Sequence, residues 1–91
     1  MVAVKKTKLN RREAIPEMGR TIFDYSKLRG QIAEKCGSQK RFANAMGVTP
    51  SAISLKLNNK LYFSQDDILR AISVLGIEPV SISSYFFTRK L

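Results

Sequence analysis

The segment between Gln39 and Lys60 holds the residues whose types and spacing indicate a chemical role. Its second half carries three hydroxyl groups, on Thr49, Ser51 and Ser54. A hydroxyl group both donates and accepts hydrogen bonds, so it can bind the edges of several DNA bases. From position 35 to position 65 the sequence has no acidic residue; the basic residues there are Lys35, Lys40, Arg41, Lys56 and Lys60. Because a carboxylate would repel a phosphate backbone, this pattern favours binding to nucleic acid.

The composition argues against catalysis and against metal binding. The sequence has no His, which removes the commonest general base and metal ligand. Its single cysteine, Cys36, cannot form an internal disulfide or a cysteine-rich metal site, and we expect it to be a small buried apolar residue. We therefore predict that the protein is not an enzyme and uses no cofactor, metal ion or small-molecule substrate.

Length and charge describe a small basic protein. The 91 residues suit one domain, and 16 basic against 7 acidic side chains give a formal charge of +9. No apolar run reaches the roughly 20 residues of a membrane helix. No apolar segment follows the N-terminal charges, as it would in a signal peptide. We expect a cytoplasmic protein without a membrane partner.

Residues 1–21 are predicted to form a basic N-terminal arm ahead of a domain at residues 22–91. Pro16 and Gly19 interrupt any helix in the arm. Its apolar residues show no sustained period, so we expect a flexible segment. Two interpretations stay open: an inert extension, or an arm that contacts phosphates or the minor groove of DNA. The basic residues of the arm are Lys5, Lys6, Lys8, Arg11, Arg12 and Arg20.

The remaining sequence has the apolar spacing of short helices with clear end signals. Asp24 is placed to cap a first helix that ends at Gly37. Ser38 is placed to cap a second helix that ends at Gly47. The residues predicted to point inward from these two helices are Tyr25, Leu28, Ile32 and Cys36, then Phe42, Ala43 and Met46.

A third helix is predicted from Thr49 to Asn58, with Ile53 and Leu57 pointing inward. Pro50 suits its first turn, where the helix needs no backbone N–H group. The linker that follows, residues 61–63, is expected to place an aromatic ring on the core.

A fourth helix is predicted to begin with a capping box formed by Ser64 and Asp67 and to end at Gly76. A last short helix is expected from Pro79 to Ser84. The predicted fold class is all-α: a compact domain of four to five helices without a substantial sheet. The residues predicted to point inward from the fourth helix are Ile68, Leu69, Ile72 and Leu75.

The second and third helices are predicted to cross at the glycine between them. Helices that cross at about 90–120° need a small residue at the contact and a left-handed residue in the turn. Ala43 meets the first need and Gly47 the second, while Val48 fills the wedge between the helices. The outer face of the third helix then stays free. A helix about 10–12 Å across fits a DNA major groove about 12 Å wide.

The stretch QKRFANAMGVTPSAISLKLNNK, residues 39–60, resembles the helix-turn-helix of the Cro/cI-type (Xre-like, lambda-repressor-like) family. The positions that carry the resemblance are Gln39, Ala43, Gly47 and Ile53, followed by Asn58, Asn59 and Lys60. SAISLKLNNK and the ending SYFFTRKL are most similar to small phage Cro-like repressors of Gram-positive hosts. The resemblance spans residues 23–87 and implies a compact lambda-repressor-like DNA-binding domain.

The resemblance implies a role for each residue of the free face. Those expected to contact bases or the groove wall are Gln39, Thr49, Pro50, Ser51, Ser54 and Leu55. Those expected to contact phosphates are Lys40, Arg41, Lys56, Asn58 and Lys60. The third helix offers no Arg or Gln for bidentate reading of a base. We therefore expect few direct base contacts, a thymine methyl against Leu55 and a contribution from DNA shape.

One position departs from the family's pattern. Many members have an apolar residue three positions after Ile53, where this chain has Lys56, and Leu57 takes the inward position instead. The last turn of the third helix is therefore expected to be rotated. Two interpretations of Leu55 stay open: a contact with a base, or packing against a neighbouring helix.

The aromatic run Tyr85, Phe86 and Phe87 is predicted to form a homodimer interface. Three consecutive side chains cannot all point to one side of a helix or strand. At least one is therefore expected in the core, and the others at the surface. A dimer also suits a DNA partner, since two half-sites one helical turn apart need a two-fold protein.

These features together predict a sequence-specific regulator that binds double-stranded DNA, namely a phage Cro-like repressor that occupies operator DNA as a dimer. Two alternatives stay open. The first is the antitoxin of a toxin–antitoxin pair, which would bind a toxin as well as DNA. The second is a basic helical adaptor that uses the same face to bind RNA or an acidic protein surface.

Overall fold

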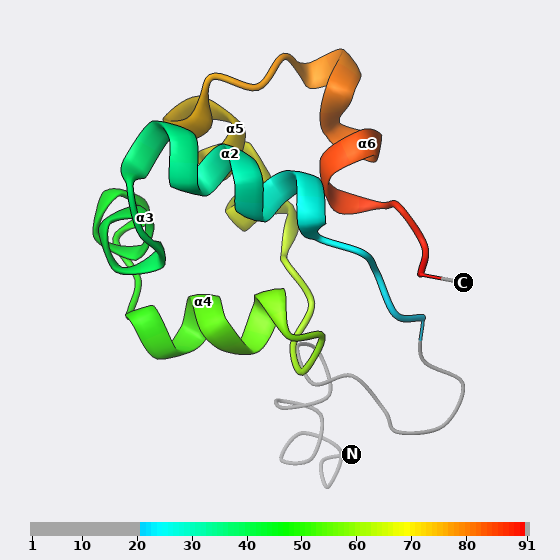
Figure 1. Cartoon of the computed structure of the whole chain (residues 1–91), viewed down its shortest axis with the longest axis horizontal. Helices are drawn as coiled ribbons and strands as arrows, with labels where there is room; N and C mark the ends of the chain where they lie inside the picture. Colours follow the sequence, from blue (N-terminus) through cyan, green and yellow to red (C-terminus); the bar gives the residue numbers. More distant parts are fainter. Residues whose placement is uncertain (1–20, 91) are drawn as a thin grey trace, which may run out of the picture.

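Local signals at the helix ends divide the chain into short helices. The structure is a computed structural model that describes residues 21–90 (Figure 1). These residues form α2 (Ser26–Cys36), α3 (Gln39–Met46), α4 (Pro50–Leu57), α5 (Gln65–Leu75), the 3₁₀ helix η1 (Pro79–Ser81) and α6 (Ile82–Phe86). For this part of the chain the all-α prediction is confirmed. The predicted arm lies, apart from Thr21, outside the described residues.

Side-chain caps stabilise the starts of α3 and α4, and the one at Ser38 was predicted. The Ser38 hydroxyl accepts a hydrogen bond from the Arg41 amide at 3.1 Å. The Thr49 hydroxyl accepts one from the Ala52 amide at 3.2 Å. Each bond satisfies an amide that has no partner within its own helix. The sequence signals therefore place the starts of both helices correctly.

The predicted capping box begins α5. The Ser64 hydroxyl accepts a hydrogen bond from the Asp67 amide at 3.0 Å, and the Asp67 carboxylate accepts one from the Ser64 amide at 2.8 Å. Asp therefore performs the role that Glu or Gln usually has at this position. Because its side chain is short, the carboxylate is held close to the helix start.

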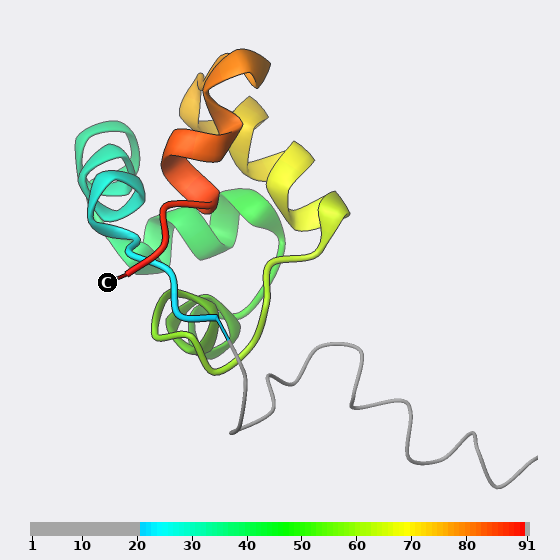
Figure 2. The same cartoon turned by 90° about the vertical axis from the view of Figure 1, so that its right-hand side faces the viewer.

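The helices pack around one centre (Figures 1 and 2), and the core there consists of aliphatic and aromatic side chains from α2, α3, α4, α5 and α6. The prediction for Leu69 is wrong: this side chain is 59% exposed, whereas Ala71 is fully buried. At 3.6 residues per turn, positions 68, 71, 72 and 75 form the inner line of α5, and position 69 lies beside it. The largest fully buried side chains are Phe42, Phe86, Leu28, Ile32, Ile53 and Leu75.

The segments before α2 and after α6 lie side by side (Figures 1 and 2). The Asp24 amide donates to the Thr88 carbonyl at 2.7 Å, and the Lys90 amide donates to the Ile22 carbonyl at 2.8 Å. These bonds form an isolated antiparallel bridge rather than a sheet. The bridge fixes the tail that follows α6 against the start of the domain.

The three consecutive aromatic residues have different environments. Phe86 is 1% exposed, and its ring meets the Phe63 ring edge-on at a centroid distance of 5.3 Å. Phe86 therefore belongs to the monomer core, and its predicted place in a dimer interface is wrong. Tyr85 is half-buried, with the Lys27 ammonium 4.7 Å from its ring centroid. Phe87 is 50% exposed.

Candidate nucleic-acid interface

A three-residue turn between α3 and α4 directs α4 to one edge of the molecule (Figure 1). Gly47 has a φ of 76°, in the left-handed region that favours glycine. The Val48 amide donates to the Ala43 carbonyl at 3.0 Å, which closes the end of α3. Ala43 is fully buried, so it allows the close approach that was predicted. The turn therefore leaves one long side of α4 without a neighbouring helix from residues 21–90.

α4 has one buried face and one exposed face. Ile53 and Leu57 are 1% and 2% exposed and fasten the helix to the core. Leu55 is 44% exposed, so it is free for contact with a partner. The exposed residues of this segment are Thr49, Pro50, Ser51, Leu55 and Asn58, with Ser54 half-buried beside them. Because residues 51, 55 and 58 are spaced by four and three, they form one outward stripe along the helix.

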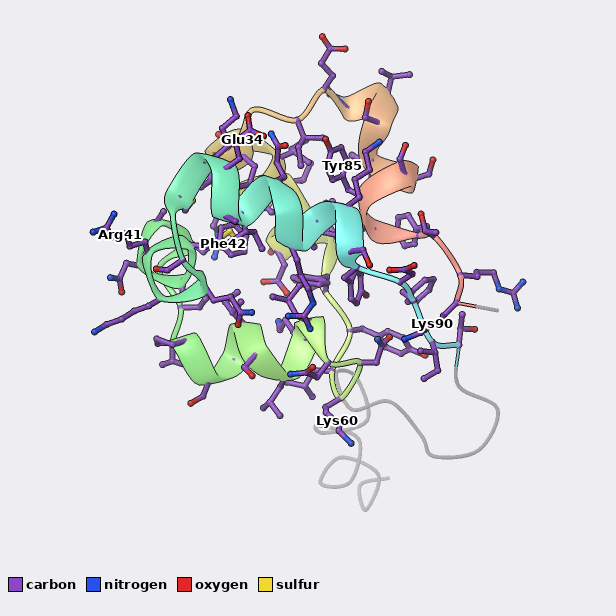
Figure 3. All side chains as sticks on the ribbon, in the orientation of Figure 1. Glu34, Arg41, Phe42, Lys60, Tyr85 and Lys90 are labelled. Carbon is purple, nitrogen blue, oxygen red and sulfur yellow. The ribbon has the colours of Figure 1, made fainter. Side chains whose placement is uncertain are left out.

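Exposed basic side chains lie on the elements before and after this stripe. Lys40 and Arg41 on α3 and Lys60 after α4 are exposed. Figure 3 shows Arg41 and Lys60 pointing away from the helices, while Glu34 lies on the opposite side of the molecule from α4. Gln39 is half-buried at the first position of α3. The surface around α4 thus gathers positive charge, which suits a polyanionic partner.

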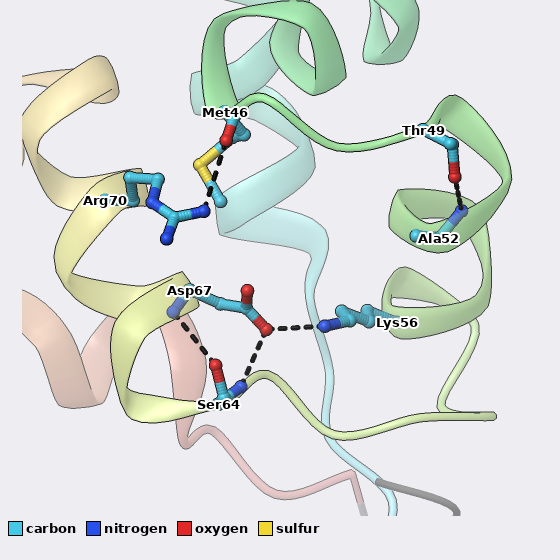
Figure 4. Close-up of polar contacts among 7 residues, drawn as sticks. All are labelled: Met46, Thr49, Ala52, Lys56, Ser64, Asp67 and Arg70. Atoms are coloured by element: carbon cyan, nitrogen blue, oxygen red, sulfur yellow. Dashed lines mark hydrogen bonds and ion pairs between the residues drawn. The ribbon is translucent and has the colours of Figure 1, made fainter.

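The Lys56 ammonium does not point outward, as a contact with a DNA phosphate would require. Its ammonium donates to the Asp67 carboxylate at 2.5 Å, and both side chains are only 12% exposed (Figure 4). The ion pair joins α4 to the start of α5 and leaves the ammonium engaged inside the protein. The Lys56 side chain is thus largely covered while its charge meets a carboxylate, at the position that differs from the Cro/cI-type pattern this sequence resembles.

The Asp67 carboxyl is influenced by two opposing effects. Burial raises its pKa, because burial disfavours the charged form. The hydrogen bonds from the Lys56 ammonium and the Ser64 amide, together with the Lys56 charge, outweigh burial and lower its pKa below the ordinary 3.8. Asp67 is therefore ionised at neutral pH and holds Lys56 in place.

A second polar network covers the C-terminal end of α4. Arg29 on α2 donates from Nη2 to the Leu57 carbonyl at 3.0 Å and to the Asn58 side-chain oxygen at 3.2 Å. The Asn58 side-chain amide donates to the Ser54 carbonyl at 2.8 Å and to the Ser54 hydroxyl at 3.3 Å. The guanidinium charge also complements the negative end of the helix dipole. Asn58, a predicted phosphate contact, is thus held by bonds within the protein.

Sequence reasoning missed three polar residues that hold this surface. One is Arg29, and the second is Arg70, which donates to the Met46 carbonyl at 3.3 Å (Figure 4). The third is Asn59, with a φ of 62°, whose side chain binds both the amide (2.9 Å) and the carbonyl (3.0 Å) of Phe23. These contacts join residues 28, 24 and 36 positions apart. No local pattern could therefore have identified them.

Within residues 21–90, no three His, Cys, Asp or Glu side chains lie together as metal ligands would. None of the helices in that range has the length and the apolar composition needed to cross a membrane.

Comparisons with known proteins relate the chain to a phage regulator. The family described as "Protein of unknown function (DUF739)" matches residues 21–89. Among solved structures, the chain is similar to the solution structure of the modulator of repression (MOR) of the temperate bacteriophage TP901-1 from Lactococcus lactis. The identity is 51% and the TM-score 0.66, over 71% of this chain and 88% of the other. No curated protein sequence matches the chain.

The similarity to the modulator of repression extends over most of that chain, so the two proteins belong to one family. A relationship to phage regulatory proteins is therefore supported by sequence and by fold. The contacts expected with bases and phosphates stay predictions at this point.

Proposed function

We propose that this chain, which belongs to the DUF739 family, is a phage regulatory protein that binds double-stranded DNA sequence-specifically through α4. The observation that carries the proposal is the exposed stripe of Ser51, Leu55 and Asn58, with exposed basic side chains on the elements before and after it. A helix with such a face fits the major groove, where polar and apolar groups read base edges. The arrangement of α3 and α4 supports a helix-turn-helix of the Cro/cI type as the architecture.

Each side chain of the surface has a proposed partner on DNA. The residues proposed to read bases are Ser51, Ser54 and Leu55, with Thr49 and Pro50 at the groove wall. Those proposed to contact phosphates are Lys40, Arg41 and Lys60, with Gln39 at a phosphate or the outermost base. Lys56 leaves this set, because its ammonium is paired with Asp67, and Asn58 leaves it, because its side chain bonds to Arg29 and Ser54. Phosphate contacts position the protein without reading sequence, so specificity depends on the few base contacts and on DNA shape.

We also propose that the protein binds DNA as a homodimer. An apolar groove of about 310 Å³ lies between α5 and α6, and Leu69 and Phe87 at its margin are 59% and 50% exposed. A second copy is the proposed occupant, because an inverted repeat requires a protein of two-fold symmetry. The proposed interface therefore retains Phe87 from the predicted aromatic run and adds Leu69. Phe86 is no longer part of it, and half-buried Tyr85 lies beside it.

The proposed mechanism is occupancy of a promoter. A dimer covers a short inverted repeat and excludes RNA polymerase, so the mechanism contains no catalytic step, cofactor or small ligand. The relative of known structure carries the name modulator of repression, which supports a role in repression for this chain.

Selection of bound sites from random DNA duplexes tests the proposal directly. We expect enrichment of one sequence with two symmetric half-sites, bound at least ~10³-fold more tightly than random DNA at physiological salt. Binding that depends on salt but not on sequence would contradict the proposal and support the basic adaptor instead.

Substitutions on and beside α4 distinguish the residues that read bases from those that position the protein on phosphates. Ser51→Ala and Ser54→Ala are each expected to lower affinity for the selected site by roughly fivefold, about one hydrogen bond, with little effect on random DNA. Lys40→Ala is expected to weaken binding to both the selected and the random DNA alike. It should also reduce the slope of the logarithm of the binding constant against the logarithm of the salt concentration by about 1. Equal losses on specific and random DNA for all three variants would show that the assigned face is wrong.

A further inference from the structure

Building on the function proposed above, we propose that Arg29, Asn58 and Ser54 form a hydrogen-bond relay that makes the Ser54 hydroxyl a donor toward DNA. The base opposite Ser54 then presents a hydrogen-bond acceptor. The relay gives a function to Arg29, which lies on α2 outside the α3–α4 pair: it is a positioning residue for a base contact that it does not itself make.

The first step of the relay is the orientation of the Asn58 side-chain amide. Its oxygen lies 3.2 Å from Arg29 Nη2, and its nitrogen lies 2.8 Å from the Ser54 carbonyl oxygen. In the reverse orientation the NH₂ group would face a guanidinium that only donates, and the oxygen would face a carbonyl that only accepts. The Asn58 nitrogen is therefore held on the Ser54 side.

Arg29 itself is anchored, which makes the orientation persistent. The same Nη2 atom donates to the Leu57 carbonyl at 3.0 Å, a backbone group at the end of α4. A guanidinium stays charged at every physiological pH and carries no acceptor. Arg29 therefore faces Asn58 with a donor under all conditions in which the protein binds DNA.

The second step sets the direction of the Ser54 hydroxyl hydrogen. Asn58 Nδ2 donates to the Ser54 hydroxyl oxygen at 3.3 Å. A serine hydroxyl has one hydrogen and two lone pairs, and the amide occupies one of the lone pairs. The hydrogen cannot point toward an NH₂ group, so the hydrogen, together with the second lone pair, is left for partners outside the relay. Half-buried Ser54 lies beside the exposed stripe of α4, where DNA supplies those partners.

The third step is the chemistry of the base that such a donor recognises. In the major groove the acceptors are N7 and O6 of guanine, N7 of adenine and O4 of thymine. Cytosine presents only its N4 amino donor there. The relay therefore predicts that one position in each half-site of the selected DNA favours an acceptor-bearing base and is depleted of cytosine on the contacted strand.

Replacement of the Asn58 NH₂ group by an oxygen atom is expected to reverse this base preference. In Asn58→Asp the carboxylate still accepts from Arg29, loses the bond to the Ser54 carbonyl, from which its second oxygen must turn away, and takes the Ser54 hydroxyl hydrogen instead of donating to it. Ser54 then presents only lone pairs to DNA. Site selection with this variant is expected to change the base at that one position toward one with a major-groove amino group, cytosine or adenine. The expected change in relative preference is about fivefold to tenfold, the size of one hydrogen bond.

Asn44→Asp is the matched control, because it makes the same chemical change at an exposed position of α3 away from the relay. Its added negative charge is expected to lower affinity for all DNA and to leave every base preference unchanged. Thermal unfolding of both variants shows whether each is folded at the temperature of the selection.

Ser54→Ala supplies an independent test that does not depend on the folding of Asn58→Asp. It is expected to remove the base preference at the predicted position and no other. In the Ser54→Ala background, Asn58→Asp is expected to have no further effect on that position. Arg29→Gln, which removes the charged donor, is expected to weaken discrimination at the same position while binding to random DNA is retained.

The outcomes distinguish the relay from the function on which it builds. If the unaltered protein selects no sequence, both proposals are overturned. If it selects a sequence, but Asn58→Asp and Ser54→Ala leave the preference at every position unchanged, the relay is overturned and sequence-specific binding stands. A change at the predicted position with Asn58→Asp, absent with Asn44→Asp, supports the relay.

Discussion

Gly47 determines the direction of α4 through its backbone conformation alone. Its φ of 76° lies in the left-handed region, and a Cβ placed there would meet no atom within 4 Å. A side chain at this position therefore has space but the wrong backbone geometry. Gly30, within α2, is the opposite case: a Cβ there also meets nothing within 4 Å, and the backbone is helical.

At the residue scale, we expect Gly47→Ala and Gly30→Ala to change stability in opposite directions. Gly47→Ala should lower the free energy of unfolding by about 1–2 kcal/mol, the cost of a left-handed alanine. Gly30→Ala should raise it by roughly 0.5–1 kcal/mol, because alanine is the better helix former. Urea denaturation followed by circular dichroism measures both. If Gly47→Ala left the free energy of unfolding unchanged, the turn could form without a left-handed residue.

The Lys56–Asp67 ion pair determines how α4 sits against α5 at the scale of the elements. The pair joins the last turn of one helix to the capping box of the next, and the Asp67 carboxylate also accepts from the Ser64 amide. Loss of one partner would leave the other largely buried and without the hydrogen bond between them, which costs more than loss of an exposed pair would.

We expect Asp67→Asn to destabilise the protein by roughly 1–3 kcal/mol at neutral pH, since it removes hydrogen bonds to a charged group. Because folding lowers the pKa of Asp67, its contribution is fully present above the unfolded value of 3.8 and is lost as pH falls through the lower folded value. Denaturation curves of the two proteins should therefore converge as the pH falls below about 4.

Asp66→Asn is the matched control for that experiment. Asp66 adjoins Asp67 in the first turn of α5 and is exposed. Its substitution should cost only the small interaction of an exposed charge with the helix dipole, roughly 0.3–1 kcal/mol. Equal losses for Asp66→Asn and Asp67→Asn would show that the Lys56 contact does not stabilise the fold.

At the scale of the whole molecule, two surfaces have separate proposed tasks. α4 lies on one edge of the molecule, with α5 and α6 on the other side of α3 (Figure 2). The apolar groove is lined by residues of α5 and α6 and by Phe87. The groove margin exposes Leu69 and Phe87, which suits contact with a second copy more than contact with a polyanion. Assembly can therefore be altered without touching the residues proposed to bind DNA.

We expect Leu69→Ser together with Phe87→Ser to convert the dimer to a monomer in analytical ultracentrifugation. Affinity for a two-half-site duplex should fall by at least about tenfold, because the second half-site is then bound independently. Val80→Ser is the control, since Val80 is 84% exposed and lies outside the groove. A protein that is already monomeric when bound to a full site would contradict the proposed dimer.

Much of the helical layout could be predicted from short sequence signals. Ser38 and Ser64 cap the helices that they were expected to cap, Thr49 caps the helix that was predicted to begin there, and Gly47 ends α3 as expected. These signals act within four residues of the chain, so the sequence carries them without reference to the rest of the fold. The exposed stripe on α4 follows from the same spacing once Ile53 and Leu57 are assigned to the core.

The sequence alone thus determined where α3, α4 and α5 begin and which face of α4 is free. It was wrong about the cap of α2, which is Tyr25 rather than Asp24, and about the end of the last helix, which extends to Phe86. Only the tertiary structure decided that Lys56 turns inward to Asp67, that Phe86 is buried and that Arg29 reaches the end of α4. The physical reason is how far apart in the sequence the interacting residues lie. A cap or a left-handed glycine is a property of neighbouring residues, whereas the position of a long or aromatic side chain depends on partners that folding brings from distant parts of the chain.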